Sequence, residues 1–407
     1  MRVMAGMATE PTGNSAQKGE IRIRVVNTLR EIGPVAWNGL AGTSKIESDS
    51  LYNPFISYGF LSSLEEAGCV SPNAGWQPQH LALEGEDGAT LGATFCYLKS
   101  HSQGEYVFDH GWADAFERAG GRYYPKLQLA VPFTPATGPR LLWRRGLEPV
   151  PVREALAQGL IALTDRLGIS SAHATFVPED EIATFEAQGY LHRTDQQFHF
   201  HNAGYGNYED FLATLSSRKR KNLRKERQSA LENGITIEWL TGGAITEAHW
   251  DVFFRFYMDT GSRKWGRPYL NRKFYSLIGE RMADDILLVM AKRDGRYIAG
   301  AINFIGHDCL YGRHWGCIED HPFLHFEVCY HQAIDFAIER KLARVEAGAQ
   351  GEHKLARGYL PVTTHSAHHI AHPGLRRAVA DYLEREREDV ERVGQILTEH
   401  GPFKKGG

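Results

Sequence analysis

The densest group of chemically active side chains lies in the segment 345–359. It combines general bases and cations in one short run, namely Glu346, Glu352, His353, Lys354 and Arg357. Carboxylates and imidazoles accept protons, whereas lysine and arginine pair with phosphate groups. We predict Glu346 and His353 as catalytic candidates, and Lys354 and Arg357 as contacts to the phosphates of a donor molecule. The alternative is a strand-to-helix turn whose charges pair with one another.

A second group stands at the beginning of a helix predicted over 326–341. Glu327 lies in the first turn of this helix, close to His325. The positive end of a helix stabilises a carboxylate, and burial raises the pKa of a carboxyl group toward that of a useful base. We therefore predict Glu327 and His325 as catalytic candidates. The recurrence of Glu327, His331 and Asp335 at every fourth position also fits a solvated helix face.

A strand predicted around 310–316 carries three more candidates. Side chains alternate between the faces of a strand, so Tyr311 and Arg313 share one face and His314 points to the other. Arg313 and His314 line one cleft only where a bulge interrupts this alternation. We predict that His314 takes part in catalysis, that Tyr311 reprotonates the leaving group and that Arg313 contacts substrate. The alternative for His314 is a packed, hydrogen-bonded histidine.

The first half of the chain offers a phosphate-binding loop and further substrate contacts. In the segment 134–140 a glycine, two hydroxyls and an arginine follow a β-rich run, a composition that suits an anion. The residues predicted to bind the donor phosphate are Thr134, Thr137, Gly138 and Arg140. The alternative is a structural turn. The predicted substrate contacts are Asp109, His110, Tyr124 and Lys126.

Residues 218–227 contain seven basic side chains and one acidic one, a local net charge of +6. On a helix this run forms a basic ridge that suits tRNA phosphates, a diphosphate or an anionic bilayer. The alternative is a helix that is only solvated.

Four histidines near the end of the sequence raise the question of a metal site. They are His365, His368, His369 and His372, in pairs four residues apart that would share a helix face. No acidic residue or cysteine lies among them, so we predict no metal site. The five cysteines include no C-x-x-C pair, which argues against a disulfide framework and for a reducing cytoplasm.

The elements that must position these residues alternate between strands and helices. Strands are predicted at 21–26, 81–85, 93–99, 170–178, 190–202, 235–240, 287–306, 309–318 and 344–348, with two shorter β-rich pieces within 127–143. Helices are predicted at 152–167, 179–188, 208–232, 246–281, 326–341 and 375–398. Asp294 and Gly295 mark a hairpin turn. The fold class is therefore α/β (α+β), with an amphipathic helix near the C-terminus.

Length and composition limit the remaining choices. The 407 residues suffice for two or three domains, and 42% hydrophobic with 23% charged residues is ordinary for a globular protein. The net charge of −3 argues against a surface built throughout for nucleic acid, and no DNA partner is expected. No run reaches the roughly 18 apolar residues of a membrane-spanning helix. We predict a flexible leader at 1–20, an N-terminal domain at 21–201 and a C-terminal domain at 207–407.

Five segments carry a family likeness: 108–142, 216–227, 260–270, 310–339 and 345–359. Together they resemble the FemAB-like predicted N-acyltransferases of the GNAT superfamily. The resemblance implies a tandem of GNAT-like domains that transfers an acyl or aminoacyl group to an amine. One segment departs from it. Residues 319–325 contain two acids and no glycine, where GNAT enzymes hold the coenzyme A pyrophosphate on a glycine-rich turn.

The resemblance and the candidate residues together lead to one expected function. We expect a cytoplasmic N-acyltransferase, with peripheral contact to the inner membrane left open, that moves an acyl group from acyl-CoA to an amine such as a sphingoid base. It is expected to hold no tightly bound cofactor. One alternative is a Fem-type enzyme that uses aminoacyl-tRNA as donor. The other is a catalytically silent module that binds a lipid or a cell-wall precursor.

Overall fold

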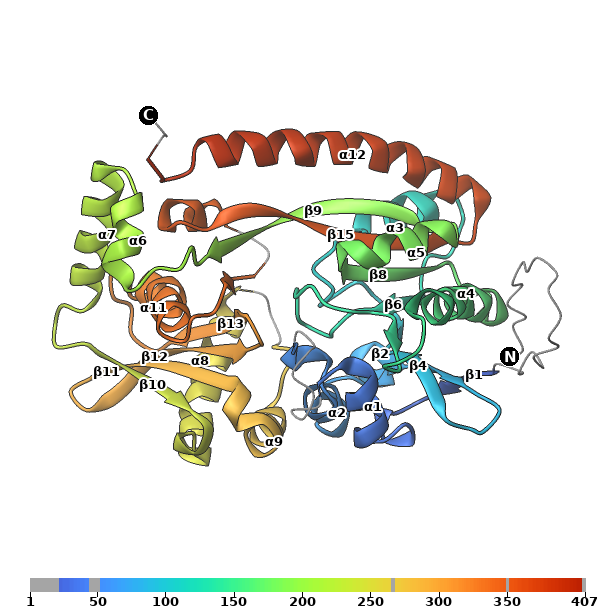
Figure 1. Cartoon of the computed structure of the whole chain (residues 1–407), viewed down its shortest axis with the longest axis horizontal. Helices are drawn as coiled ribbons and strands as arrows, with labels where there is room; N and C mark the ends of the chain where they lie inside the picture. Colours follow the sequence, from blue (N-terminus) through green and yellow to red (C-terminus); the bar gives the residue numbers. More distant parts are fainter. Residues whose placement is uncertain (1–21, 44–51, 265–267, 349–350, 405–407) are drawn as a thin grey trace. The chain divides into compact units, whose positions relative to one another are not determined.

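The computed structural model describes residues 22–43, 52–264, 268–348 and 351–404, which divide into two compact units (Figure 1). Among these residues, unit 1 comprises 22–43, 55–195 and 364–387, and unit 2 comprises 52–54, 196–363 and 388–404. The sequence predicts two contiguous halves instead, at 21–201 and 207–407. The difference arises because three long elements each run from one unit into the other. These are β9 (Leu191–His201), β15 (Leu360–Ile370) and α12 (Pro373–Glu399).

Unit 1 contains a sheet in the order β1-β3-β4-β7 and a second set of strands in the order β15-β8-β6-β5-β2. Its strands are β1 (Arg22–Val26), β2 (Trp76–Pro78), β3 (His80–Glu84), β4 (Thr90–Thr94), β5 (Tyr97–Lys99), β6 (Lys126–Leu129), β7 (Leu142–Trp143) and β8 (Ser171–Val177). Its helices are α1 (Pro34–Ala41), α2 (Tyr58–Glu66), α3 (His110–Arg118), α4 (Pro149–Leu167) and α5 (Glu179–Ala187). The apolar stripe of α4, with Leu156 and Leu160, packs against Leu127 and Ala172 in the core.

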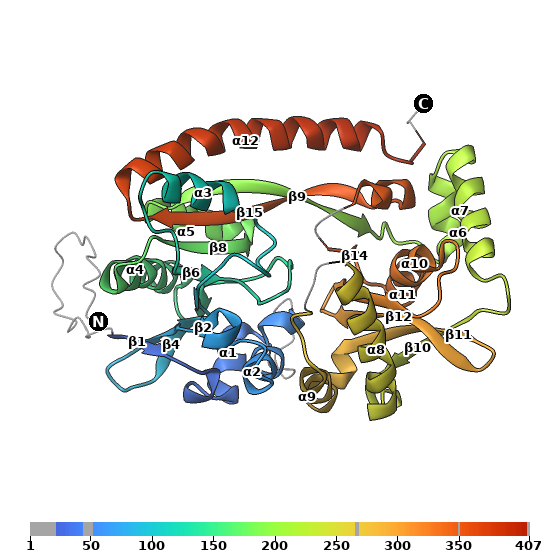
Figure 2. The ribbon, with the colours of Figure 1, turned by 180° about the vertical axis from the view of Figure 1, so that it is seen from behind.

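Unit 2 contains strands in the order β10-β11-β12-β13-β14-β9. Besides β9, they are β10 (Thr236–Thr241), β11 (Ile286–Arg293), β12 (Arg296–Ile305), β13 (Cys309–Cys317) and β14 (Arg344–Glu346). The helices are α6 (Tyr208–Thr214), α7 (Ser217–Ala230), α8 (Glu247–Lys264), α9 (Arg272–Met282), α10 (Leu324–Phe326), a π-helical turn (Glu327–His331) and α11 (Gln332–Glu339). Seen from the two sides, α11 covers one face of these strands and α8 the other (Figures 1 and 2).

Both units repeat one plan. In unit 1, β5 and β6 are antiparallel, and a crossover that contains α4 leads into β8, which is parallel to β6. In unit 2, β10 to β13 are antiparallel, and a crossover through α10 and α11 leads into β14, which is parallel to β13. The prediction of a mixed α/β fold with a repeated module is confirmed. Among the described helices, none combines the length and apolar character that a bilayer crossing requires.

Three predicted helices are interrupted, and the strands β2 and β15 lie outside every predicted strand. The helix over 208–232 breaks at Leu215, which is extended and fully buried, and the region 246–281 divides where Asn271 caps the start of α9. The helix over 326–341 contains the π-helical turn, which lies between α10 and α11. The histidine-rich segment forms the strand β15, because it pairs with β8 of unit 1. The placement of those histidines on helix faces is therefore wrong.

Candidate active site

The parallel strands β13 and β14 bring Tyr311 and Glu346 together in unit 2. They are partners in the strand register, and the pairing of the two strands ends with them. Their neighbours Leu310 and Val345 belong to the apolar core that contains α11. Because side chains alternate along a strand, Tyr311 and Glu346 lie on the opposite face of the sheet. Each is only 4% exposed.

Glu346 is a buried carboxylate whose two oxygens are only partly hydrogen-bonded. Arg344 Nε donates to Oε1 over 3.4 Å, and the Cys309 side chain also hydrogen-bonds the carboxylate. Oε2 is buried and has no hydrogen-bond partner within the described part of the chain. Burial raises the pKa of Glu346 to about 7, although Arg344 opposes the shift. A carboxylate with this pKa accepts and returns a proton near neutral pH, which is what a general base requires.

Two neutral groups flank this carboxylate. Burial raises the pKa of Tyr311 well above its usual value, so its phenol is protonated at neutral pH. His199 on β9 is the register partner of Glu346, with Nε2 4.0 Å from Oε2. Burial, followed by the charge of Arg344, lowers the pKa of His199 to about 3, so this imidazole is neutral. The sequence did not indicate His199, because only the pairing of β9 with β14 brings it here.

A bulge in β13 decides how Arg313 and His314 are oriented. Ile302 pairs with His314 and Asn303 pairs with Gly312, which leaves Arg313 as the extra residue. The His314 ring lies 5.0 Å from the Tyr257 ring of α8, and burial lowers the pKa of His314 to about 3. The simple alternation predicted for 311–315 is therefore interrupted. Gly316 is required here, since a Cβ would come within 2.1 Å of the backbone of Phe256 in α8.

Glu327 is engaged in a buried ion pair. Arg227 of α7 donates to both of its oxygens, with Nη2 2.8 Å from Oε1 and Nε 3.0 Å from Oε2, and also to Asp335 at 2.6 Å. Gln332 adds a hydrogen bond of 2.6 Å to Oε1. The alternative of a solvated helix face is wrong for Glu327, because its side chain is fully buried. Its contacts suit a structural ion pair better than a proton acceptor.

The helix start and the segment after β14 face each other within unit 2. His353 lies 5.6 Å from Phe326 and 6.4 Å from His325, measured between ring centroids. Arg357 donates through Nε and Nη2 to Glu226 of α7, at 2.8 and 2.7 Å. Arg357 thus pairs with a residue outside the segment 345–359, and a phosphate contact by it stays a prediction.

Lys354 contacts the chain just after the end of β14. Its side chain is buried, and its Nζ donates to the carbonyl of Gly348 at 2.8 Å. Burial lowers the pKa of Lys354 to about 8. A phosphate contact by Lys354 stays a prediction.

Two of the predicted substrate contacts of unit 1 belong to a buried charged cluster. Lys126 Nζ lies 2.7 Å from Glu105 Oε2 and 2.5 Å from Asp109 Oδ2, and Tyr123 donates to Asp109 at 2.7 Å. Lys99 joins them, 3.6 Å from Glu105. The sequence did not single out Glu105 or Lys99, because their neighbours come from distant strands and loops.

Of the other two predicted contacts of unit 1, Tyr124 borders this cluster, because the Lys126 Nζ lies 6.0 Å from the centroid of its ring. Tyr124 hydrogen-bonds Ser102 at 2.8 Å, and Ser102 hydrogen-bonds Asp109. His110 is exposed at the beginning of α3.

The loop predicted to bind the donor phosphate uses its polar groups for hydrogen bonds within unit 1. Arg140 is fully buried, and its guanidinium donates to the carbonyls of Thr175, Gly138 and Ala136 at 2.9, 2.7 and 2.9 Å. The Thr134 hydroxyl donates to the carbonyl of Pro132, and the Gly138 N–H donates to that of Phe176. These contacts fit the alternative of a structural turn, and phosphate binding by Arg140, Thr134 and Gly138 stays a prediction. Thr137 is half-buried and stays a prediction.

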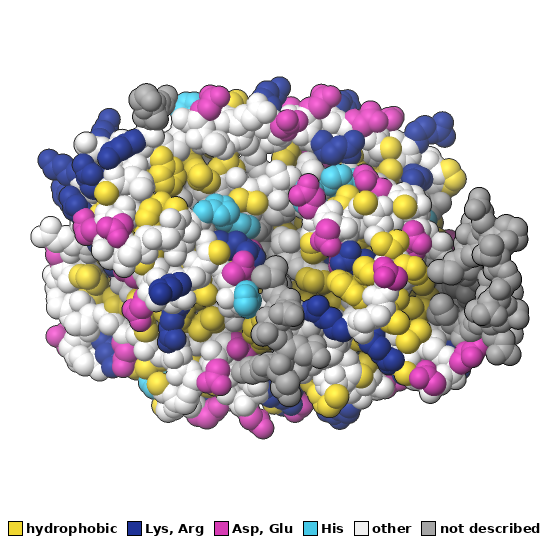
Figure 3. Space-filling model, viewed as in Figure 1, with side chains coloured by type: hydrophobic (Ala, Val, Ile, Leu, Met, Phe, Trp, Pro, Cys, Tyr) yellow, Lys and Arg dark blue, Asp and Glu magenta, His cyan; other side chains and the backbone are white. Residues whose placement is uncertain are grey.

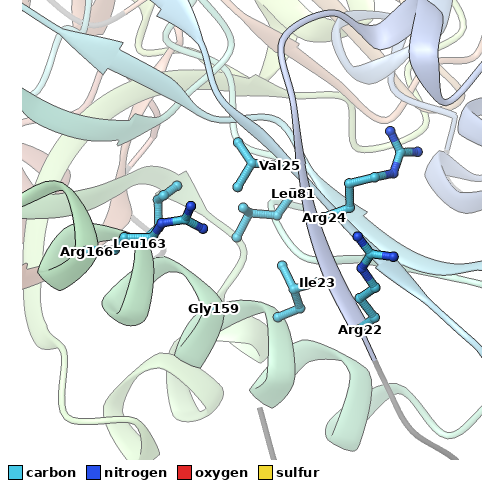
Figure 4. Close-up of a pocket in the computed structure, with 8 residues that line it drawn as sticks. All are labelled: Arg22, Ile23, Arg24, Val25, Leu81, Gly159, Leu163 and Arg166. Atoms are coloured by element: carbon cyan, nitrogen blue, oxygen red, sulfur yellow. The ribbon is translucent and has the colours of Figure 1, made fainter. Parts of the chain in front are cut away.

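A pocket of about 260 Å³ in unit 1 lies between β1, β3 and α4 (Figure 4). It is lined by Arg22, Ile23, Arg24, Val25, Leu81, Gly159, Leu163 and Arg166. None of the predicted site residues borders it.

Comparison with known proteins places this architecture in a family. A family model named FemAB-like, with the description peptidoglycan biosynthesis/recognition, matches residues 28–405. The chain belongs to the FemAB-like family. It is accordingly a transferase that moves an acyl or aminoacyl group. No curated protein matches the FemAB-like chain.

Solved structures are similar to this FemAB-like chain at low sequence identity. A conserved Bacteroides thetaiotaomicron protein of unknown function is 12% identical, with a TM-score of 0.51, and the match covers 86% of this chain and 100% of that one. FemX is 12% identical, with a TM-score of 0.47 and coverage of 82% and 96%. L-PGS from Bacillus licheniformis is 11% identical, with a TM-score of 0.48 and coverage of 83% and 99%. The likeness to the Bacteroides thetaiotaomicron protein, with its TM-score of 0.51, supports the fold.

Proposed function

We propose that this protein is a Fem-type aminoacyltransferase, which moves an aminoacyl group from aminoacyl-tRNA to an amine with Glu346 as general base. The observation that carries the proposal is the buried carboxylate of Glu346, which has a pKa of about 7 and one oxygen without a partner among the described residues. An amine that donates its N–H to Oε2 would complete the hydrogen bonding of this oxygen and place its proton beside the base.

The chemistry requires an uncharged amine and a carbonyl carbon held about 3–3.5 Å apart. The amine nitrogen attacks the ester carbonyl of the donor, and Glu346 takes the proton that the nitrogen loses. When the tetrahedral intermediate collapses, the bond to the ribose oxygen breaks, and Tyr311 donates a proton to that oxygen. Glu346 then returns its proton through Tyr311 or water, so both groups end in their starting states.

We propose aminoacyl-tRNA and not acyl-CoA as the donor, because the residues predicted to bind coenzyme A make other contacts. Arg140 and Thr134 are used inside unit 1, and the turn over 319–325 has two acids and no glycine. The exposed face of α7, in contrast, carries Arg218, Lys221 and Lys225, and basic side chains gather there on the surface (Figure 3). A surface of this kind suits the phosphates of an RNA backbone.

The acceptor is proposed from the family description. An enzyme of peptidoglycan biosynthesis would take the amine of a peptidoglycan precursor, a narrower choice than the sphingoid base expected from the sequence. A tRNA-dependent enzyme works where charged tRNA is present, so we place it in the cytoplasm. Contact of α7 with an anionic membrane is the competing use of the same basic surface.

A transfer assay tests the proposal. The protein is mixed with radiolabelled aminoacyl-tRNAs and a panel of amines that includes peptidoglycan-precursor peptides, and the product is identified by mass spectrometry. We expect transfer by the wild type and loss of transfer by the Glu346→Gln variant. Release of free thiol from acyl-CoA with the same amines, without transfer from tRNA, would overturn the proposed donor. Binding of α7 to anionic vesicles but not to tRNA would count against it as well.

A further inference from the structure

A cluster of aromatic and histidine rings lies on unit 2, between the π-helical turn and the segment that follows β14. Its members are Trp315, His325, Phe326, Tyr330 and His353. The His325 ring lies 5.2 Å from Trp315 and 5.4 Å from Phe326, and the Phe326 and His353 rings are inclined by only 34°. Tyr330 is buried, three rings are half-buried and His353 is exposed. Several rings therefore present part of their surface to solvent.

Polar contacts hold the outer rings in place. The Tyr330 hydroxyl and His353 Nε2 are 2.9 Å apart. The guanidinium of Arg357 lies 3.4 Å from the centroid of the Phe326 ring and donates through Nη1 to the carbonyl of His353 at 2.6 Å. Rings fixed in this way lose little conformational freedom when a flat ligand stacks on them, which favours binding.

The same arginine ties the ring cluster to the basic helix α7. Arg357 donates to both carboxylate oxygens of Glu226, and Glu226 also bonds His331 Nε2 at 2.9 Å. Glu226 belongs to the inner side of α7, whose outer side exposes Arg218 and Lys221. The basic surface and the rings are thus joined through a pair of salt-bridged residues within one unit.

The ring cluster lies beyond the point where β13 and β14 stop pairing. Glu346 is the last paired residue of β14, and Lys354 binds the carbonyl of Gly348, two residues further on. His353 packs on Phe326, and Trp315, which follows Tyr311 on β13, packs on His325. A ligand end that stacks on the rings lies beside the place where the pairing of β13 and β14 stops.

We infer that the ring cluster is a base-stacking site for the unpaired 3′ end of a tRNA; this inference rests on the proposed tRNA donor. Unpaired nucleotides stack on aromatic and histidine rings and on arginine planes, whereas a duplex offers only its grooves and backbone. Basic side chains on α7 would hold the phosphates, and the rings would hold the terminal bases. The aminoacyl ester at the 3′ end would then lie next to Glu346.

Binding of two forms of one fluorescent tRNA tests this site. One form is intact and the other lacks its last three nucleotides, and the affinities of the wild type and of two variants are measured by anisotropy. His353→Leu removes the exposed ring, and His353→Phe keeps one. Loss of one stacked base corresponds to roughly a tenfold weaker affinity. We expect this loss for His353→Leu on the intact tRNA, little further loss on the truncated tRNA, and substantial rescue by His353→Phe.

The outcomes separate this site from the proposed donor. If the wild type binds both tRNAs and His353→Leu weakens them equally or not at all, the stacking site is overturned while the tRNA donor stands. If the wild type binds neither tRNA, the donor is overturned and the stacking site with it. If His353→Leu loses affinity for a peptidoglycan glycan fragment but not for intact tRNA, the rings serve a sugar and the inference is wrong. Lys221→Ala is the matched control, because it should weaken both tRNAs alike.

Discussion

The parallel strand pairs of the two units share a plan but carry different chemistry. In unit 1, β6 supplies Lys126, whose ammonium lies between two carboxylates at 2.7 and 2.5 Å. In unit 2, β14 supplies Glu346, whose nearest guanidinium donates over 3.4 Å to one oxygen only. Both groups are buried. The difference lies in how closely the opposite charge approaches.

Electrostatic consequences follow from that difference. Burial raises the pKa of Asp109, but Lys126, His173 and Ser102 together outweigh burial, so the pKa of Asp109 is well below its usual range. At Glu346 burial outweighs Arg344, and the pKa rises to about 7. The comparison teaches that one fold plan yields either a closed ion-pair cluster or a base that can change its charge, depending on the cation beside the carboxylate.

The largest expected effect concerns Glu346. Glu346→Gln should lower kcat by about 10²–10⁴-fold, because it removes the proton acceptor while keeping the size of the side chain. In the wild type, kcat should rise with pH through about 7, where Glu346 becomes ionised. Steady-state kinetics between pH 5 and 9 measure both. Full turnover by Glu346→Gln would show that the base lies elsewhere.

Glu327→Gln is the matched control for this comparison of carboxylates. It leaves Arg227 with weaker partners and should lower stability, but it should keep the rise of kcat near pH 7. If Glu327→Gln abolishes that rise and Glu346→Gln does not, the roles of the two residues are reversed.

Unit 1 should respond to loss of its central lysine by losing stability. Lys126→Met leaves Asp109 buried without its ammonium and Glu105 with only the more distant Lys99, and removing one partner of a buried ion pair costs about 3–5 kcal/mol. Urea denaturation measures the change in the free energy of unfolding. Adding Asp109→Asn to Lys126→Met should recover part of the loss. An unchanged stability of Lys126→Met would contradict the view of unit 1 as a closed cluster.

The pH dependence of stability gives a smaller effect with a definite sign. Glu346 has a pKa of about 7 when folded and an ordinary value of 4.5, so its protonated form stabilises the fold below pH 4.5 and this contribution is lost as the pH rises through 7. The gap corresponds to about 3 kcal/mol. Relative to Glu346→Gln, the wild type should therefore lose about this much free energy of unfolding between pH 4.5 and 8. Parallel pH profiles for the two proteins would show that Glu346 has an ordinary pKa.

The smallest effect concerns the exposed charges of α7, which have no counterpart among the buried ion pairs. Lys221→Ala should weaken tRNA binding uniformly and lower the slope of log affinity against log salt by about 1. Its free energy of unfolding should stay within about 0.5 kcal/mol of the wild type, because the side chain is exposed. Anisotropy titrations at several salt concentrations test this. An unchanged slope would remove Lys221 from the RNA surface.

Local patterns predicted many elements because their signals are local. Asp294 and Gly295 have positive φ angles at the turn between β11 and β12, as their hairpin signal indicates, and the apolar periodicity over 152–167 appears as α4. Long-range pairing was not predictable in this way. The strand β15 was missed because its partner β8 lies almost two hundred residues away in the sequence.

The candidate residues show the same division. Glu346 and Tyr311 were identified from their types, and the structure makes them register partners. Arg140 has the right type for a phosphate ligand, yet three carbonyls of its own surroundings take its donors. Residue type indicates what a side chain can do, whereas the neighbours that the fold supplies decide whether its donors and acceptors are already used.

By itself the sequence determined the α/β alternation, the family likeness and the presence of bases, acids and cations in a few segments. Only the tertiary structure decided which carboxylate can change its charge. The pKa of Glu346 depends on desolvation and on the distance to Arg344, and that of Asp109 depends on Lys126. The desolvation of Glu346 and the approach of Lys126 to Asp109 are set by packing between segments that are separate in the chain, and no local pattern contains them.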